Sequence, residues 1–356
     1  MVQLRLGDVF EKIKKLQSNS VHCIITSPPY WGLRIYSHGK QRSKEMGQED
    51  CIESHIGQMV IFLRECYRVL RTDGTLWLVC GDTYTDDRKF NKHSNRRTGL
   101  PRRSMLGIPW RVAIAALNNG WSIRQEIIIE NPTAAPGGDI DRPSTSHQTM
   151  FLLAKSDKYY YDRVGSAEKA TGVCRLRKKA ELQPDRHEQL VRGNARLHES
   201  MQYATDTRRL RSVWRVPINK SPADLPPKTS HHARFPLNLP MKVMTAAIPS
   251  EGCCANCEAP YERIVVRRRR KVEGVPTVFY DTDGWKKPCS CKTTKRVRPL
   301  VLDTFCGSGT TLIAATRHNC RAIGMELNPL YGKEVKQWLS QEANQRKRGE
   351  KKMTRK

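Results

Sequence analysis

Residues 301–311 read VLDTFCGSGTT, an apolar run that passes through a Gly-x-Gly turn into good helix formers as far as Arg317. Glycines let the backbone approach a ligand closely, and the first turn of a helix offers unpaired N–H groups. The next apolar run, residues 322–325, ends in Glu326, where an acidic side chain can bond ribose hydroxyls, as in nucleotide-binding β-α-β units. The pattern therefore predicts two strands joined by a ligand-binding turn and a helix.

This turn differs from two common phosphate-binding motifs. No third glycine follows at the spacing of G-x-G-x-x-G, and no lysine stands where a phosphate loop has one. These departures argue against NAD and against ATP as the ligand.

A second motif lies near the N-terminus, where the apolar residues 21–25 are followed by Thr26 and then by Ser27-Pro28-Pro29-Tyr30. Proline has no N–H for a strand ladder, it fixes φ, and it pushes the preceding residue out of the helical region. We therefore expect the chain to leave the sheet as a stiff, extended turn that holds carbonyl acceptors and an aromatic ring in place. Such a turn suits a planar group with an exocyclic amino group. The simpler alternative is an ordinary proline strand terminator.

The two motifs together resemble those of the DNA methyltransferases that methylate amino groups, on cytosine N4 or adenine N6. Asp-x-Phe-x-Gly-x-Gly with a downstream Glu is similar to their S-adenosylmethionine site, and Ser-Pro-Pro-Tyr is similar to their catalytic motif. The catalytic motif comes first in the chain, which resembles the circularly permuted β-group of this family. Two further stretches resemble family elements, residues 6–8 with 19–21 at the opening strand–helix–strand and residues 235–239 at the Phe-Pro-x-x-Leu cofactor element.

The resemblance implies an α/β fold, a circularly permuted Rossmann-like sheet that is mostly parallel with an antiparallel hairpin at its edge. It also implies S-adenosyl-L-methionine as cofactor and double-stranded DNA as partner. Ser27 and the Pro28 carbonyl would accept the hydrogens of the target amino group, and Tyr30, with Trp31 as a second candidate, would stack on a base flipped out of the duplex. The expected catalytic residues are Ser27, Pro28, Pro29 and Tyr30. The expected cofactor-binding residues are Asp8, Phe235, Pro236, Asp303, Phe305, Cys306, Gly307, Gly309, Thr310, Glu326 and Asn328.

The first residue of the catalytic motif bears on the target base. Serine at position 27 favours cytosine N4 within this family, and adenine N6 is the closest alternative. C5-cytosine methylation needs a nucleophilic cysteine in a Pro-Cys turn. The only such dipeptide, Pro288-Cys289, lies in a cysteine cluster, so the sequence argues against methylation at C5. More distant alternatives are an RNA or protein methyltransferase and a zinc-containing DNA-binding protein without catalytic activity.

The cysteine cluster has the spacing of a metal site. Cys254-x2-Cys257 lies about thirty residues before Cys289-x-Cys291, and four thiolates on two tight turns are the ligand set of a structural zinc site. Strand-like runs at 261–266 and 275–280 predict a zinc-ribbon hairpin between the two pairs. Cys253 is then the spare cysteine. Unligated cysteines in a loop are the alternative.

Composition points to a polyanionic partner. The 356 residues carry 63 Lys and Arg against 35 Asp and Glu, a formal net charge of +28. Three basic stretches, 88–103, 163–220 and 267–271, are expected to contact DNA, and 163–220 occupies the position of the family's target-recognition region. A disordered basic linker is the alternative for 163–220. We find no run of 18 apolar residues and no signal-peptide core, so we expect no membrane association and an intracellular, reducing location. A homodimer and a cognate restriction endonuclease are the further partners considered.

These observations predict the following organisation. Residues 1–162 form the catalytic half of the methyltransferase domain, 163–230 the basic recognition region, 231–250 and 296–340 the cofactor-binding half, 251–295 the four-cysteine insertion, and 341–356 a basic disordered tail. Within the first half, we expect a helix over 56–70, a turn at Asp73-Gly74 before a strand at 75–80, and an edge hairpin of residues 150–153 with 158–161.

Overall fold

The computed structural model describes residues 1–33, 35–36, 45–85, 98–101, 103–134, 141–170, 204–216, 236–272 and 275–353. Much of the predicted basic loop and of the predicted recognition region, and Phe235, lie outside these residues.

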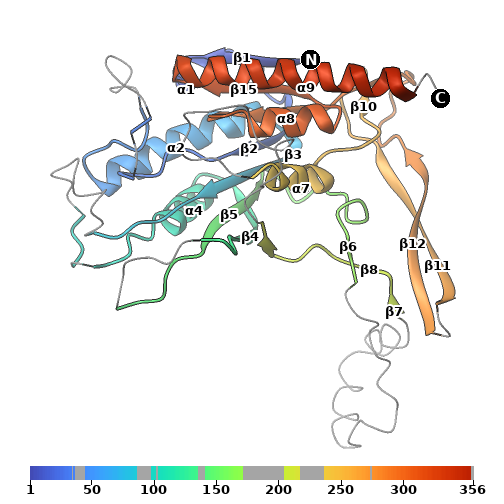
Figure 1. Ribbon diagram of the computed structural model, residues 1–356, viewed down its shortest axis with the longest axis horizontal. Helices are drawn as coiled ribbons and strands as arrows, with labels where there is room; N and C mark the ends of the chain where they lie inside the picture. The colour runs from blue at the N-terminus through green and yellow to red at the C-terminus, as the bar shows by residue number, and fades with distance from the viewer. Residues whose placement is uncertain are drawn as a thin grey trace, which may run out of the picture.

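An eight-stranded sheet organises the chain, in the order β1-β15-β14-β2-β3-β5-β4-β9 (Figure 1). Its strands are β1 (Val2–Leu6), β15 (Arg321–Glu326), β14 (Leu300–Asp303), β2 (Val21–Thr26), β3 (Leu70–Cys80), β5 (His147–Ala154), β4 (Ser122–Glu130) and β9 (Val213–Arg215). Neighbours from β1 to β3 are parallel, β5 is antiparallel to both β3 and β4, and β9 is parallel to β4. The predicted mostly parallel sheet with antiparallel pairing towards one edge is confirmed.

The order of strands shows the permuted connectivity. β14 and β15 come last in the chain, yet they lie between β1 and β2, which come first. The two halves of the sequence therefore build one sheet together.

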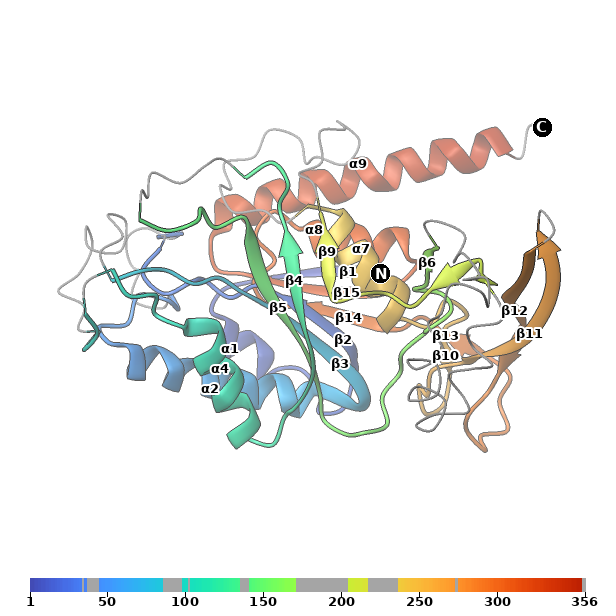
Figure 2. The same cartoon turned by 90° about the horizontal axis from the view of Figure 1, so that it is seen from below.

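Helices cover both faces of the sheet (Figure 2). On one face, α1 (Val9–Ile13), α2 (Ile52–Val69) and α4 (Ile108–Asn118) contribute to one hydrophobic core. On the other, α7 (Asn238–Ala247), α8 (Thr310–Arg317) and α9 (Pro329–Met353) contribute to a second. All six residues of β2 are buried, because this central strand faces a core on each side. Its near-continuous apolar sequence is typical of such a strand.

Several expectations about local structure are wrong. Residues 150–153 belong to β5, which pairs with β4, whereas 158–161 form no strand and Tyr160 N–H bonds the Asp73 carbonyl at 2.9 Å. Asp73-Gly74 lies within β3 as a bulge, because the pairing with β2 moves from Val21↔Leu70 to Cys23↔Thr75.

The helix before β3 begins at Ile52, four residues earlier than the expected helix. The chain end also differs, since α9 continues to Met353 through most of the predicted disordered tail. That segment is rich in Lys, Arg, Gln and Glu, which are good helix formers as well as charged residues.

The four-cysteine insertion forms the expected hairpin and extends it. β11 (Glu262–Val272) pairs antiparallel with β12 (Val275–Lys286), and β12 also pairs with β7 (Ala204–Thr205). Two short pairs lie nearby, β10 (Cys253–Cys254) with β13 (Arg296–Val297), and β6 (Glu168–Lys169) with β8 (Thr207–Arg208). Among the helices of the described residues, none is long and apolar enough to cross a membrane.

Candidate functional site

The two sequence motifs lie side by side at the C-terminal ends of two central strands of the sheet. The proline-rich turn leaves the C-terminal end of β2 and the glycine turn leaves that of β14, and these two strands are parallel neighbours. The Oγ1 atoms of Thr26 and Thr304, the residues at the two exits, are 2.8 Å apart and hydrogen bonded. Carboxyl ends of parallel strands are where ligands bind in open α/β sheets. Residues 278 positions apart in the sequence thus frame one site.

Within the proline-rich turn, Ser27 Oγ donates to Tyr30 Oη at 3.3 Å. Pro28 is buried, while Ser27 and Tyr30 are half-buried at the edge of the sheet. The serine and the aromatic ring expected to hold a base are therefore adjacent.

Two glycines that sequence reasoning missed shape this turn. A Cβ on Gly81, directly after β3, would lie 2.3 Å from Cε2 of the Tyr30 ring, and a Cβ on Gly47 would lie 3.0 Å from the Pro29 carbonyl oxygen. The approach at Gly81 is too close for any side chain, and Gly47 combines a tight approach with a φ of 87°, so glycine is favoured at both positions. A glycine immediately after an apolar strand was the available signal at position 81.

Trp31 does not have the expected stacking role. Its side chain is 1% exposed, its Nε1 donates to the Glu49 carbonyl at 2.8 Å, and its ring stacks on His55 with centroids 6.1 Å apart. His55 is in turn held by the Glu49 carboxylate at 2.9 Å. Trp31 therefore supports the turn from within the core and presents no face to a ligand.

The glycine turn has the backbone that a close ligand approach requires. Gly307 and Gly309 have φ of 49° and 84°, and Gly309 is the N-cap of α8 without a side-chain cap. A Cβ at Gly309 would also lie 2.9 Å from Val335 Cγ1. Both the conformation and the space therefore favour glycine at position 309.

Glu326 anchors this turn from the end of β15. Its Oε2 accepts the Gly307 N–H at 2.9 Å and its Oε1 accepts the Asn328 N–H at 2.8 Å. The side chain is almost entirely buried, and burial raises its pKa to about 7. Burial likewise raises the pKa of Asp303 to about 6, although its Oδ1 accepts the Phe305 N–H at 3.1 Å. Two carboxyls of raised pKa beside one turn are a feature of ligand sites.

Several other predicted cofactor residues surround the same turn in structural roles. Asp8 caps α1 by accepting from Glu11 N at 3.1 Å, and the neighbouring Gly7 N–H bonds the Glu326 carbonyl at 2.8 Å. Asn328 accepts from Leu330 N at 3.0 Å at the start of α9.

Asn328 also connects the two halves of the sequence. Its Nδ2 donates to the Tyr36 carbonyl at 2.8 Å, which joins the segment after the proline-rich turn to the end of β15.

The remaining predicted cofactor residues lie on the glycine turn or at the start of a helix. Phe305 packs against Phe62 with centroids 5.3 Å apart, and Cys306 is buried with its N–H on the Met325 carbonyl. Thr310 opens α8, with its Oγ1 3.2 Å from Ser308 Oγ. Pro236 lies just before α7, and its carbonyl accepts the Leu239 N–H at 3.0 Å.

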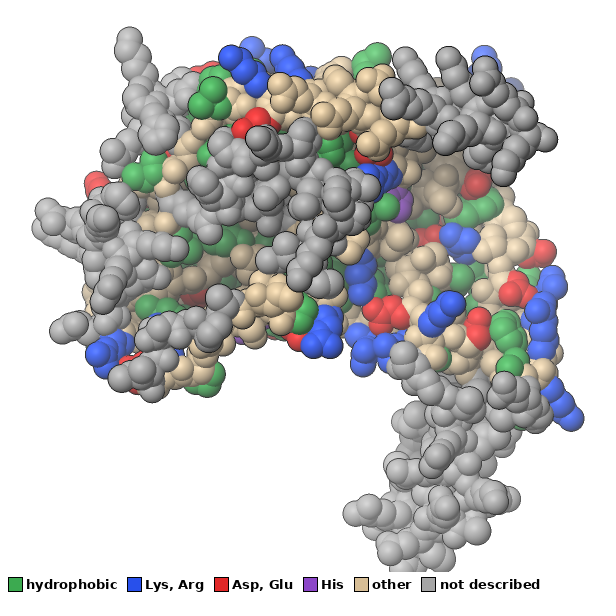
Figure 3. All heavy atoms as spheres, viewed as in Figure 1, with side chains coloured by type: hydrophobic (Ala, Val, Ile, Leu, Met, Phe, Trp, Pro, Cys, Tyr) green, Lys and Arg blue, Asp and Glu red, His purple; other side chains and the backbone are tan. Residues whose placement is uncertain are grey.

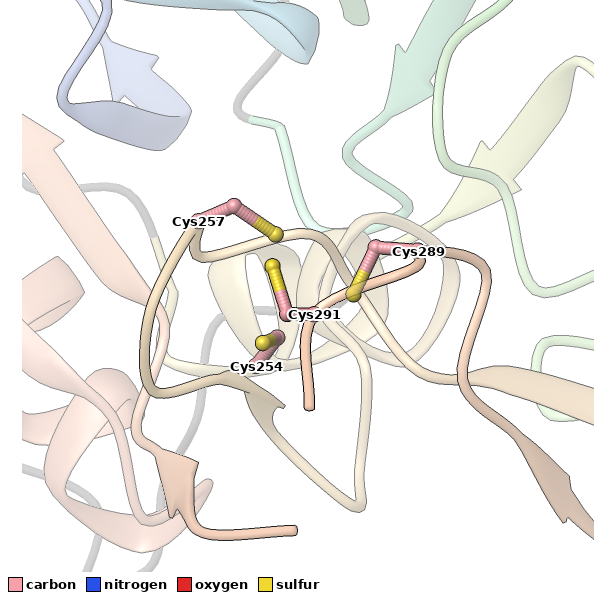
Figure 4. A group of neighbouring side chains, drawn as sticks. All are labelled: Cys254, Cys257, Cys289 and Cys291. Carbon is pink, nitrogen blue, oxygen red and sulfur yellow. The ribbon is translucent and has the colours of Figure 1, made fainter. Parts of the chain in front are cut away.

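The four predicted metal-binding cysteines come together. The Sγ atoms of Cys254, Cys257, Cys289 and Cys291 all lie within 4.8 Å of one another and point towards a common centre (Figure 4). Tetrahedral zinc with Zn–S of about 2.3 Å places its sulfur atoms about 3.8 Å apart, so the set fits a closed four-thiolate site. Backbone N–H groups of Cys257 and Asn256 lower the pKa of Cys254 to about 6. Cys253 is outside the group and fully buried, in keeping with its place as the spare cysteine.

The loop of residues 254–258 is docked against the N-terminal ends of β15 and β3. The Glu258 carboxylate accepts two bonds from Arg321 at 2.9 Å each, and the Cys257 carbonyl accepts one from Arg71 at 3.1 Å.

His22, at the start of β2, also holds this loop. It accepts the Leu300 N–H at Nδ1 and donates from Nε2 to the Glu258 carbonyl, both at 3.1 Å. Burial lowers its pKa to about 4, so the ring is neutral and keeps both bonds at neutral pH. The cysteine site therefore supports the N-terminal ends of the strands, at the end of the sheet opposite to the two motifs.

Comparison with known proteins identifies the family. The family model for DNA methylases of the N6/N4 type matches residues 21–255 and 291–337, which is most of the chain. The protein belongs to this DNA methylase family. The segment between the two matches, 256–290, contains the β11–β12 hairpin.

The curated relatives of this chain are methyltransferases as well. The chain is 29% identical to the type II methyltransferase M.Cfr9I of Citrobacter freundii over 339 residues, 91% of this chain and 83% of that protein. It is 41% identical to M.SmaI of Serratia marcescens over 170 residues, 44% of this chain, and the alignment spans only 57% of that protein.

Solved structures share the fold at low identity. The cytosine-N4-specific PvuII DNA methyltransferase superposes with a TM-score of 0.54 at 15% identity, covering 94% of this chain and 84% of that one. A Thermus thermophilus protein assigned as a DNA modification methylase and solved with S-adenosyl-L-methionine superposes with a TM-score of 0.50 at 21% identity, covering 96% and 94%.

Proposed function

We propose that this protein transfers a methyl group from S-adenosyl-L-methionine to the exocyclic amino nitrogen of cytosine, at N4, in double-stranded DNA. The observation that carries the proposal is the junction of the Ser-Pro-Pro-Tyr turn with the glycine turn, closed by the 2.8 Å bond between Thr26 and Thr304. Membership of the DNA methylase family supports the same reaction class.

The residues present fit the methyl donor. The positive φ angles of Gly307 and Gly309 give the turn a backbone suited to close approach, and the buried Glu326 carboxylate offers acceptors to ribose hydroxyls at the end of β15, as in other nucleotide-binding β-α-β units. When bound, S-adenosyl-L-methionine supplies an electrophilic methyl group on a sulfonium. The glycine turn and Glu326 would orient it towards the proline-rich turn, and orientation is what an in-line displacement needs most.

On the other side, Ser27 and the Pro28 carbonyl would accept the hydrogens of the target amino group. The amino nitrogen is a poor nucleophile because its lone pair is delocalised into the ring, and these acceptors would help to localise it. Tyr30 would stack on the flipped base and hold it in the path of the methyl group. In the displacement, the sulfur–carbon bond breaks, the nitrogen–carbon bond forms, and the nitrogen releases one proton.

Adenine N6 is the alternative base. Serine at position 27 favours cytosine, while the family as a whole includes both bases. Mass spectrometry of nucleosides from plasmid DNA treated with the purified protein and isotope-labelled S-adenosyl-L-methionine tests the proposal. We expect labelled N4-methylcytosine. Labelled N6-methyladenine would show that the target base is adenine and not cytosine, and DNA without label would refute methyl transfer altogether.

We further propose that the four cysteines hold a structural Zn²⁺, because the closed thiolate set leaves no open coordination position for chemistry.

The predicted division of the chain into catalytic, recognition, cofactor-binding and cysteine segments is retained as a proposal. The names of the relatives, all type II methyltransferases, support the hypothesis of a modification enzyme that acts beside a restriction endonuclease.

A further inference from the structure

The β11–β12 hairpin has two faces of different character. Residues directly opposite each other in an antiparallel pair share a face, and side chains alternate along each strand. The register pairs Arg267 with Tyr280, Arg269 with Val278 and Lys271 with Pro276. These pairs define the first face, and the interleaved residues, including Arg268 and Arg270, define the second.

Charge on the second face is partly neutralised within the hairpin. Asp281 Oδ2 lies 3.5 Å from Arg268 Nε and 3.3 Å from Arg270 Nη2. The Arg270 guanidinium also lies 5.4 Å from the centroid of the Phe279 ring. Both arginines therefore have partners inside the hairpin.

On the first face, two cations have no ion pair among the described residues. Arg267, Arg269 and Lys271 are exposed, and within the described residues neither Arg267 nor Lys271 forms an ion pair. The exposed Arg163, from the segment after β5, adds a fourth cation 5.9 Å from the centroid of the Tyr280 ring. Figure 3 shows Lys and Arg side chains gathered along the outer edge of the molecule, where Figure 1 places β11.

The hairpin is held firmly at its base. Arg263 donates to both oxygens of the buried Asp162, with the shortest contact 2.7 Å, and its guanidinium lies 4.3 Å from the centroid of the Trp285 ring. The pairing of β12 with β7 also joins the hairpin to the described part of the predicted recognition region in one three-stranded sheet. A face whose backbone is fixed in this way loses less loop freedom on binding.

We propose that the first face, with Arg267, Arg269, Lys271 and Arg163, binds the phosphate backbone of double-stranded DNA. The proposal rests on the proposed function, which makes DNA the substrate, and adds a docking surface built mainly on a hairpin that lies between the two segments matched by the family model. Same-face residues of a strand are about 7 Å apart, so the row on β11 extends about 14 Å. One strand of B-DNA presents a phosphate about every 3.4 Å of axis, so such a row spans about four phosphates.

A pair of double variants on the same strand tests the proposal. Arg267→Gln with Lys271→Gln removes two charges from the first face, and Arg268→Gln with Arg270→Gln removes two from the second. Binding of the full-length protein to a fluorescent duplex of about 30 base pairs is measured across a salt series. The first variant should flatten the slope of log K against log salt by about 1.8, because each phosphate contact contributes about 0.9. The second should keep a slope close to that of the wild type.

Equal slopes in the two variants, or a larger change in the second, would overturn the proposal. Metal content and melting temperature of both variants establish that the hairpin is folded. Methyl transfer to plasmid DNA is measured in parallel, so the two hypotheses fail separately. If the wild type methylates DNA and the first variant keeps the full salt slope, the docking surface alone is refuted. Protein that binds DNA through the first face without transferring methyl groups refutes the reaction alone.

Discussion

At the scale of single residues, Tyr30 is the side chain whose position is most closely determined. Its ring lies where a Cβ of Gly81 would be, and Ser27 Oγ bonds its hydroxyl. The ring was predictable from the motif, whereas its contact with Gly81 was not, because Gly81 lies far along the chain and the contact depends on how β3 ends beside β2. The same limit explains Trp31, whose burial follows from His55 and Glu49 on a different part of the chain.

The stacking role of Tyr30 leads to the first prediction. Tyr30→Ala should remove roughly 1–3 kcal/mol of base binding, and methylation should collapse while S-adenosyl-L-methionine still binds. Tyr30→Phe is the matched control, since it keeps the ring and loses only the hydroxyl bonded to Ser27. Methylation rates and calorimetric cofactor affinities of both variants provide the test. Near-normal turnover in Tyr30→Ala would exclude stacking.

Glu326 leads to a prediction about pH. Burial raises the pKa of the free carboxyl to about 7, and ribose hydroxyls that donate to it would favour its ionised form. A ligand that prefers the ionised form binds more tightly as pH rises through this pKa, and its affinity levels off above it. Affinity for S-adenosyl-L-methionine should therefore be about tenfold weaker at pH of about 6 than at about 8.

Glu326→Gln provides the control for this prediction, because glutamine does not titrate. The variant should bind the cofactor more weakly, and the part of the pH dependence that belongs to Glu326 should disappear. Calorimetry of both proteins across the same pH range measures the difference. Identical pH profiles of cofactor affinity in the two proteins would mean that the ribose does not bind to Glu326.

At the scale of elements, local patterns predicted the strands and helices that carry the motifs. β2, β14, α8 and β15 were all predictable, because each has a continuous apolar run with a clear stop signal. The β4–β5 pair was not, because β5 is as apolar as a central strand and its partner lies across a long connection. Pairing at that distance depends on the assembled sheet rather than on adjacent sequence.

The cysteine site gives the prediction at this scale. Cys257→Ser with Cys291→Ser should remove about one zinc per chain and make residues 251–295 sensitive to protease. The structure adds a consequence for the sheet. Arg321, Arg71 and His22 bond the loop that the metal would hold, so the melting temperature of the whole protein should fall.

Cys253→Ser is the matched control, because Cys253 lies next to the site in sequence but outside the four-sulfur group. Metal content should remain near one per chain in this variant. Limited proteolysis, metal analysis and calorimetric melting distinguish the outcomes. A double variant with unchanged melting temperature and protease resistance would leave the cluster without a structural role.

At the scale of the whole molecule, the permuted order makes the two halves of the sequence depend on each other. The motif order in the sequence predicted this connectivity, which the strand order confirms. The composite sheet of β11, β12 and β7 could not be predicted, because β7 and β12 are far apart in the sequence and the pairing covers only two positions. The predicted recognition region and the cysteine insertion are therefore structurally joined, although the sequence separates them.

Interleaving of the halves leads to the last prediction. A fragment of residues 1–250 contains the catalytic turn but lacks β14 and β15, which lie between β1 and β2 in the sheet. Without them, β1 has no partner strand in the described sheet and β2 loses one side. Val301, Leu302, Ala322 and Met325, each at most 1% exposed, would be missing from the two cores. Burial of a large apolar side chain contributes about 1.5–3 kcal/mol, so their combined loss is a large share of the stability of an ordinary domain.

The fragment 1–250 should therefore show no cooperative melting, although it retains every residue of the proline-rich turn. A chain ending at residue 345 is the control, because it keeps all eight strands and shortens only α9. It should melt cooperatively and bind S-adenosyl-L-methionine with wild-type affinity. Near-ultraviolet circular dichroism during heating, with calorimetric cofactor titration, measures both. Cooperative melting of 1–250 would mean that the N-terminal half forms its own sheet, and the site could then not depend on the joining of β2 to β14.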